Sequence, residues 1–478
     1  MLFNSIKFAI FLPIVFILYW YVTNKSLRFQ NLLLLIASYY FYACWDWRFL
    51  FLLVFSTLLD YYTGIKMSDS KTKKDRKKWF WLSISVNLGF LGFFKYYNFF
   101  ADSFAKAIEE LGLHVNPWTL KIILPVGISF YTFHGLSYVI DIYKDRIKAE
   151  KNFIEYAVFV SFFPLLVAGP IERATHLLPQ IKKARIFDNK NAIEGLRQIL
   201  WGIFKKVVIA DQCAEYANLI FNSYADHAGS KLVLAAAIFA FQIYCDFSGY
   251  SDIAIGSAKL FGIDLIRNFA FPYFSRDIAE FWRRWHISLS TWFRDYLYIP
   301  LGGSKVGKWT KVRNTFIIFI VSGFWHGANW TFIIWGFLNA LYIMPSILLN
   351  TNRNNLDIVA SGKLFPKLKD LFSIILTFGL TVFAWIFFRS DTVGHAFDFI
   401  SIIFSKSLFT IPSNRPDQIF IFLFIFLTIE WFGREKQFAI AHLETKWPKA
   451  VRWLFYYAIL ITIFNFAGAE QQFIYFQF

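Results

Sequence analysis

Apolar runs of about 18 to 22 residues recur along the whole chain, separated by short polar segments. A helix of that length crosses a hydrocarbon core of about 30 Å, and it satisfies its backbone hydrogen bonds internally. The runs lie near residues 1–22, 30–45, 48–65, 80–100, 120–140, 196–222, 231–262, 314–349, 371–388, 418–432 and 453–467. This pattern predicts an all-α, polytopic membrane protein with about 10–13 membrane helices. The first run lacks a small-residue cleavage site and is interpreted as a retained span.

One further apolar stretch, 153–169, interrupts the regular alternation of sides. Basic segments precede it at 141–152 and follow it at 173–197, and short basic loops mark the cytoplasmic side of a membrane. Pro164 and the Gly169–Pro170 pair break a straight helix within it. We expect this stretch to re-enter without crossing; an external basic loop is the alternative.

Composition and charge agree with a lipid-embedded chain. Hydrophobic residues make up 57% and charged residues 17%, which is far from the composition of a soluble domain. The net charge of +17 is concentrated in short loops, above all 66–78, where it fits anionic lipid headgroups rather than nucleic acid. Neither a repeat nor a soluble segment is present, so residues 1–478 are interpreted as one domain. The three cysteines lie far apart and indicate no metal site.

His326 stands out within the longest uncharged segment. Residues 314–352 contain no Asp, Glu, Lys or Arg, and as one helix they would reach about 58 Å, nearly twice the membrane core. Gly327, Ala328 and Asn329 form the natural break. An ionisable group at an intramembrane break is a functional candidate, as a general base or as a proton relay. The alternative is a neutral histidine that bridges two helices.

A second candidate, His286, lies in the aromatic segment 280–303. Its aromatic residues recur at helical spacing, which predicts one helix in the headgroup plane with His286 on the inward face. Arg283 and Arg284 flank that face. They fit an anionic group such as a pyrophosphate or phosphopantetheine, or else serve as lipid anchors, and His286 is equally well explained as a packed interfacial side chain.

The segment 245–256 (CDFSGYSDIAIG) places Asp246 and Asp252 between apolar stretches. Carboxylates at that depth are costly unless they are paired or hydrated. The local serines and Gly249 predict a helix break capped by an aspartate, and the sharper hypothesis is that these carboxylates line a polar passage.

Five segments, taken in order, resemble the membrane-bound O-acyltransferase family, in the bacterial branch typified by the membrane subunit of alginate O-acetylation. They are LPVGISFYTFHGLSYVIDIY, FPLLVAGPIER, DFSGYSDIAIG, FWRRWHISLSTWFRDYLYIPLGG and GFWHGANWTFIIWG, and the terminal FIYFQF is also typical. The resemblance covers essentially the full length. It implies helices around a central tunnel, including re-entrant and interfacial ones, in an enzyme that moves an acyl group onto a hydroxyl.

The resemblance places the family's essential histidine at His326 and its second histidine at His286. We expect His326 to act as general base and His286 to position substrate or polarise the carbonyl. Substrate-binding residues are expected among Trp325, Asn329, Arg283, Arg284 and Asp246. No bound cofactor and no metal are expected.

The expected reaction starts from a cytoplasmic thioester, either acetyl-CoA or another acyl thioester, at a bacterial cytoplasmic (inner) membrane. The acyl group, most simply acetyl, would pass through a periplasmic O-acetyltransferase-like partner to an exported polysaccharide. A D-alanyl transferase acting toward teichoic acid is the nearest alternative. A transporter and a noncatalytic scaffold are the others, although the chain shows no internal symmetry of the transporter kind.

Overall fold

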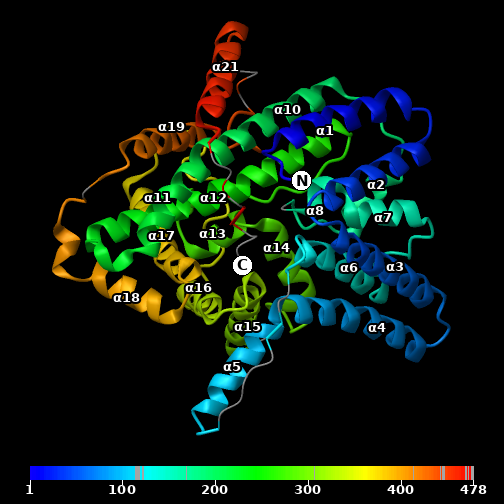
Figure 1. Cartoon of the computed structure of the whole chain (residues 1–478), viewed down its shortest axis with the longest axis horizontal. Coiled ribbons are helices and arrows are strands. Elements are labelled where there is room, and N and C mark those ends of the chain that lie inside the picture. The colour runs from blue at the N-terminus through cyan, green and yellow to red at the C-terminus, as the bar shows by residue number, and fades with distance from the viewer. Residues whose placement is uncertain are drawn as a thin grey trace. The chain divides into compact units, whose positions relative to one another are not determined.

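The computed structural model describes residues 1–113, 119–120, 123–167, 169–305, 307–412, 414–441, 443, 447–468, 471 and 473–474. The fold is 73% helical, and the described residues contain no strand (Figure 1). The predicted all-α class is therefore confirmed. The contacts within the chain divide it into two compact units. Unit 1 comprises Met1–Gly195 and Ala254–Ile266, and unit 2 comprises Leu196–Ile253 and Arg267–Phe478.

Unit 1 is built mainly from the first nine helices. Their bounds are α1 (Ile6–Ile17), α2 (Leu27–Ala43), α3 (Trp47–Asp69), α4 (Lys73–Leu91), α5 (Tyr97–Glu109), α6 (Ile128–Tyr143), α7 (Phe153–Ser161), α8 (Phe163–Leu166) and α9 (Ala174–Ile181). Short π-helical turns follow α1 and α4, at Leu18–Val22 and Gly92–Tyr96. Helices α10 (Asn189–Phe204) and α12 (Gly229–Leu260) contribute residues to both units.

Unit 2 holds the remaining helices of the described part of the chain. They are α11 (Asp211–Asn222), α13 (Ile278–Arg284), α14 (Ile287–Phe293), α15 (Lys308–His326), α16 (Trp330–Leu348), α17 (Leu368–Arg389), α18 (Val393–Ile403), α19 (Asp417–Gly433) and α21 (Lys449–Phe466). Single π or 3-10 turns lie at Lys205–Ala210, Tyr224–Asp226, Pro272–Phe274, Arg294–Tyr298 and Lys406–Phe409.

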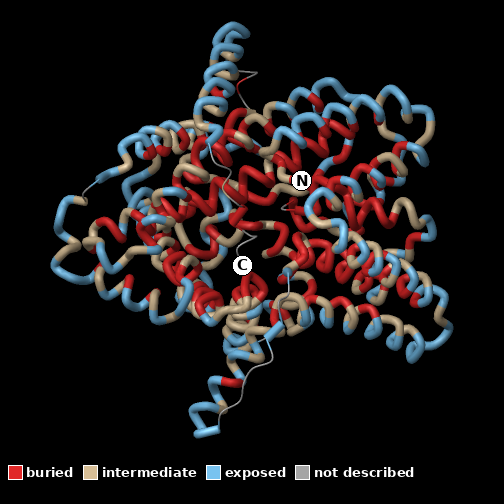
Figure 2. Tube along the Cα trace, in the orientation of Figure 1, coloured by how far each residue is buried: buried red, intermediate tan, exposed pale blue. Residues whose placement is uncertain are grey.

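Four of the described helices are long and apolar enough to cross a membrane, namely α3, α12, α16 and α17. The apolar window of α12 is 78% buried, whereas those of α3, α16 and α17 are 33%, 39% and 44% buried (Figure 2). Protein therefore encloses α12, and the other three expose much of their apolar surface. Such surface suits lipid rather than water, in agreement with a membrane protein.

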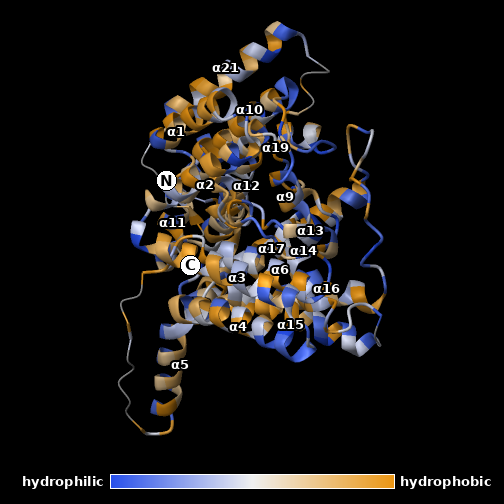
Figure 3. Cartoon of the chain, turned by 90° about the vertical axis from the view of Figure 1, so that its right-hand side faces the viewer, coloured by the Kyte–Doolittle hydropathy of each residue, from blue (hydrophilic) through white to orange (hydrophobic). Residues whose placement is uncertain are grey.

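Helix α1 shows the same feature at the level of single side chains. Phe8, Phe11, Leu12 and Val15 are buried in unit 1, while the isoleucines on the opposite face are more than half exposed. Those exposed residues are Ile6, Ile10, Ile14 and Ile17. Hydrophobic residues, orange in Figure 3, run along much of the helical part of the chain. A helix that is apolar on both its packed and its outer face has a lipid-facing side.

Two basic segments of unit 1, 66–78 and 141–152, meet in the structure. The Arg76 guanidinium donates to the Asp145 carboxylate at 2.6 and 3.0 Å, and the backbone N–H of Ala149 donates to Ser68 Oγ at 3.3 Å. Both segments therefore lie on one face of unit 1, as two loops on the same side of a membrane must.

The stretch predicted to re-enter forms two short helices, α7 and α8, separated by Phe162. The nine residues of α7 span only about 14 Å, less than half of a hydrocarbon core. Lys182 Nζ, beyond the stretch, pairs with Glu150 Oε2, before it, at 2.7 Å. The chain thus returns to the place it left, which is the geometry that re-entry requires.

Candidate active site

His326 is the last residue of α15, and the helix break predicted after it is confirmed. Gly327 is extended, and Asn329 caps α16 by accepting a hydrogen bond from the Thr331 N–H at 3.1 Å. The two helices form a tight hairpin because Gly323 packs its α-carbon against backbone: a Cβ there would lie 2.2 Å from the Phe332 carbonyl oxygen. Small residues allow such close helix pairs in membranes.

The turn is tightly packed around Gly327. A Cβ at Gly327 would lie 2.1 Å from the Phe332 ring, and that ring contacts Phe388, which in turn contacts His326. We expect Gly327→Ala to lower the free energy of unfolding by about 1–3 kcal/mol through overpacking. Activity should fall as a result. Thermal unfolding of the purified protein measures the first effect.

Gly379 provides the matched control, because a Cβ there meets nothing within 4 Å in the middle of α17. Gly379→Ala should be neutral or raise stability by up to about 1 kcal/mol. Equal losses in the two variants would contradict the packing argument for Gly327.

An aromatic box surrounds His326, whose side chain is 3% exposed. The ring centroids of Trp325, Trp335 and Phe388 lie 4.8, 5.1 and 5.3 Å from that of His326. Trp385 of α17 stacks on Trp335 at 5.6 Å. The imidazole therefore sits in a low-dielectric environment, where electrostatic interactions with a reacting group are stronger than in water.

His286 occupies a sharp turn, so the prediction of one continuous helix through 280–303 was wrong. Helix α13 ends at Arg284, His286 takes a left-handed backbone conformation with φ of 41°, and α14 begins at Ile287. Segment 268–270 fills the break: the Ala270 N–H donates to the Arg284 carbonyl and the Ile287 N–H donates to the Asn268 carbonyl, both at 2.9 Å. This distant segment satisfies backbone groups that the break would otherwise leave unpaired.

Asn268 also holds the His286 side chain, a contact that sequence reasoning missed. Its Oδ1 lies 3.0 Å from His286 Nδ1, and it accepts hydrogen bonds from the Ser288 hydroxyl at 3.0 Å and the Ser288 N–H at 3.3 Å. Its Nδ2 donates to Ser251 Oγ at 3.1 Å. His286, Asn268 and Ser288 are all at most 1% exposed, so these bonds lie away from water.

The two candidate histidines share one neighbour, Trp325. Its ring centroid lies 4.8 Å from that of His326 and 6.1 Å from that of His286. Phe247 of α12 packs edge-on against His286 at 4.6 Å. The structure therefore brings both predicted histidines into one buried aromatic cluster within unit 2, although 40 positions separate them in the sequence.

The helix break predicted at 245–256 is absent, because α12 runs unbroken from Gly229 to Leu260. Gly249 serves close packing instead: a Cβ there would lie 2.8 Å from the Gly202 carbonyl oxygen of α10. Asp246 forms an ion pair with Lys206 at 2.8 Å and accepts a hydrogen bond from the Ile474 N–H at 2.8 Å. Its expected contact with substrate stays a prediction, as do those of Trp325 and Asn329. Residues 475–478 of the typical FIYFQF terminus lie outside the described part of the chain.

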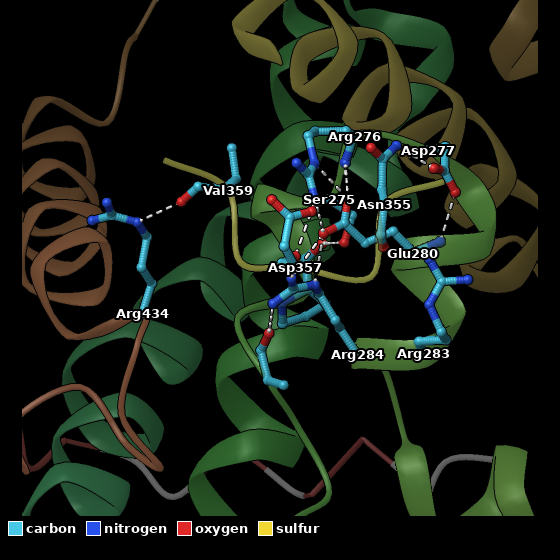
Figure 4. A network of polar contacts seen from close by, with 12 residues as sticks. Ser275, Arg276, Asp277, Glu280, Arg283, Arg284, Asn355, Asp357, Val359 and Arg434 are labelled. Atoms are coloured by element: carbon cyan, nitrogen blue, oxygen red, sulfur yellow. Dashed lines mark hydrogen bonds and ion pairs between the residues drawn. The ribbon is translucent and has the colours of Figure 1, made fainter. Parts of the chain in front are cut away.

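Arg283 and Arg284 are both engaged with the protein (Figure 4). Arg283 donates to the carbonyls of Asn352 and Asn355 at 2.8 and 2.7 Å. Arg284 pairs with the buried carboxylate of Glu280 at 2.8 Å and donates to the Asp357 carbonyl at 2.9 Å. These bonds fasten α13 to the segment that leads from α16 to α17, and a role in substrate binding stays a prediction for both arginines.

Comparison with known proteins bears on this arrangement. Residues 143–387 match the model of the membrane-bound O-acyltransferase family. The chain is 38% identical to a probable alginate O-acetylase of Pseudomonas aeruginosa over 94% of its own length and 84% of that protein. It is 36% identical to a peptidoglycan O-acetyltransferase of Helicobacter pylori (83% and 78% covered) and 30% identical to a teichoic acid D-alanyltransferase of Streptococcus thermophilus (61% and 75% covered).

A helical membrane protein with two buried imidazoles and these relatives is an O-acyltransferase. The chain belongs to the membrane-bound O-acyltransferase family.

Proposed function

We propose that this protein passes an acetyl group from a cytoplasmic thioester donor across the membrane to a hydroxyl, for O-acetylation of an exported cell-envelope polysaccharide. A periplasmic O-acetyltransferase-like protein is the proposed intermediate acceptor. The setting is the cytoplasmic membrane of a bacterium. The donor is acetyl-CoA or another acetyl thioester.

The pair of buried imidazoles that share the neighbour Trp325 carries this proposal. Acyl transfer to a hydroxyl needs a group that removes the hydroxyl proton as the oxygen attacks, and a buried neutral histidine has that capacity. The names of the relatives support acetyl as the group and a polysaccharide as the final acceptor.

In the proposed reaction, His326 is the general base. His326 takes the proton of the acceptor hydroxyl while the oxygen forms a bond to the thioester carbonyl carbon. The carbon–sulfur bond then breaks, and the departing thiolate receives that proton from His326. Thioester and alcohol thus become ester and thiol, and His326 returns to its neutral state. The Trp325, Trp335 and Phe388 rings exclude water, which limits hydrolysis of the thioester.

D-Alanyl transfer toward teichoic acid is the second candidate, supported by the 30% identity to such a transferase over 61% of the chain. The alginate and peptidoglycan O-acetylases match more of the chain at higher identity, which favours acetyl transfer.

Membrane vesicles from cells that express the protein test the proposal. We expect radiolabelled acetyl-CoA to label envelope material with a base-labile acetyl ester in inverted vesicles, which expose the cytoplasmic face, and not in sealed right-side-out vesicles. Vesicles with the His326→Ala variant are the blank. Labelling from a D-alanyl carrier but not from acetyl-CoA would favour the second candidate, and labelling of right-side-out vesicles would overturn the cytoplasmic donor.

A further inference from the structure

The environment of His286 contains a fixed hydrogen-bond pattern that determines which ring nitrogen carries the proton. The oxygen of the Asn268 side chain can be assigned without ambiguity because the backbone N–H of Ser288, an obligate donor, points to it at 3.3 Å. The amide nitrogen on the other side donates to Ser251 Oγ. A flipped amide would place two donors face to face at Ser288.

The Asn268 oxygen can only accept hydrogen bonds, so the His286 Nδ1 facing it at 3.0 Å carries the proton. A neutral imidazole has one protonated and one unprotonated nitrogen, and Nε2 is therefore the acceptor nitrogen of the ring. Burial lowers the pKa of His286 to about 3, which agrees with a neutral ring at physiological pH. His286 lies outside the four candidate spans.

We propose that Asn268 is a positioning residue for acyl transfer: it fixes His286 as the Nδ1–H tautomer, so that Nε2 accepts a hydrogen bond from a substrate N–H or O–H other than the attacking hydroxyl. This inference rests on the proposed function, and it changes one expectation. An acceptor nitrogen cannot polarise a thioester carbonyl, which requires a donor. His286 thus orients the bound substrate, while His326, which also contacts Trp325, takes the single proton of the attacking hydroxyl.

The architecture explains why an asparagine does this from so far along the chain. Asn268 belongs to the segment that fills the break between α13 and α14, and its backbone carbonyl accepts from the Ile287 N–H. Main chain and side chain of one residue therefore fix both the backbone turn and the ring orientation of His286. A ring held only by packing against Phe247 and Trp325 would keep its place but not its tautomer.

Replacement of Asn268 is the direct way to alter the charge state of His286, because the Asn268 side chain contacts Nδ1 of the ring. Among the described residues, the titratable and charged groups next to this cluster are His326, which also contacts Trp325, Tyr244 and Tyr250 of α12, Glu430 and Lys205 beside Tyr244, and Asp246 with Lys206 beside Tyr250. Tyr244 packs on Phe269 and donates to Glu430 at 2.7 Å, and Tyr250 packs on Phe473. Tyrosines titrate near pH 10 in water, and the other charged groups are the same in the wild type and in the Asn268 variants, so the comparison between these proteins isolates position 268.

Asn268→Asp and Asn268→Ala test the proposal through the pH profile of acetyl transfer. The carboxylate of Asn268→Asp accepts the same bonds from Ser288 and from Nδ1–H, which favours its charged form, and it stabilises protonated His286. The tautomer is kept, but the neutral ring now requires a higher pH. We expect the acidic limb of this variant to lie about 1–2 pH units above that of the wild type, so that transfer is lost at an acidic pH at which the wild type is still active.

Asn268→Ala removes the constraint. We expect kcat to fall by about 100-fold with KM little changed, since a misoriented catalytic group acts on turnover, and we expect no displacement of the acidic limb. Asn87→Ala is the matched control: Asn87 is 2% exposed in unit 1 and donates to Asp60 at 2.8 Å. It should lower stability without altering the pH profile. An unshifted Asn268→Asp profile, or wild-type kcat in Asn268→Ala, would overturn the proposal.

A second measurement does not depend on turnover. Solid-state NMR of ¹⁵N-histidine-labelled protein in lipid bilayers distinguishes the two tautomers, and the His286 signals are those absent from His286→Gln. We expect the proton on Nδ1 in the wild type. A proton on Nε2 would overturn the role of Asn268 whatever the activity, whereas the expected tautomer in a protein without acetyl transfer would count against the proposed function alone.

Discussion

Replacing His326 by alanine is expected to abolish acetyl transfer while folded protein remains in the membrane. Loss of a general base costs about 10²–10⁴-fold in rate, and a residual rate of that size falls to background in a vesicle assay. The protein should still fold, because Trp335, Phe388 and Trp385 contact one another independently of the imidazole. Labelled-acetate incorporation and the amount of monodisperse purified protein are the two measurements.

His395→Ala is a matched control for this experiment. His395 lies on α18 in unit 2, stacks on Tyr224 at 4.5 Å and is absent from the aromatic box. Its loss should leave transfer intact. Full activity in His326→Ala would refute the base assignment, and equal loss in both variants would indicate a general effect of removing a packed imidazole.

Replacing Glu280 by alanine is expected to have the largest effect on stability. The Glu280 side chain is 1% exposed and accepts from Arg276 at 3.0 Å and from Arg284 at 2.8 Å, whose side chains are 8% and 13% exposed (Figure 4). Removal of one partner from a buried ionic group costs about 3–5 kcal/mol, because charge is left uncompensated. Thermal unfolding in detergent or nanodiscs measures the loss.

Asp357→Ala provides the comparison within the same network. Asp357 also pairs with Arg276, at 2.9 Å, but its side chain is 69% exposed. Exposed pairs contribute about 0–1 kcal/mol, so the expected loss is small. If Asp357→Ala destabilises as much as Glu280→Ala, burial does not determine the strength of this network.

Local signals were sufficient for part of the site. The absence of charge around His326 and the Gly327–Asn329 sequence located a helix break that the structure confirms. Gly249 gave a similar signal and misled, because its role is contact with the Gly202 carbonyl on another helix. A glycine that permits a turn and a glycine that permits close packing look the same along the sequence.

In segment 280–303 the sequence predicted a continuous helix where the structure has a break. Its aromatic spacing fits one helix. Hydrogen bonds from the distant segment 268–270 satisfy the backbone groups at His286 and so stabilise a break there. Asn268 was missed for the same reason: nothing in its local sequence indicates that it meets a histidine 18 positions later. Arg283 and Arg284 also donate to carbonyls of a distant loop. The role of these two charged side chains could therefore not be inferred from the sequence of their own segment.

The ion pair between Glu150 and Lys182 bears on the membrane orientation of every segment after Lys182. The pair brings the two ends of the apolar stretch at 153–169 together, and a stretch with both ends on one side of a bilayer crosses it an even number of times. Counting the apolar stretch at 153–169 as a single span would give an odd number. It would invert the inside and outside of every later loop, including those that flank α15 and α16.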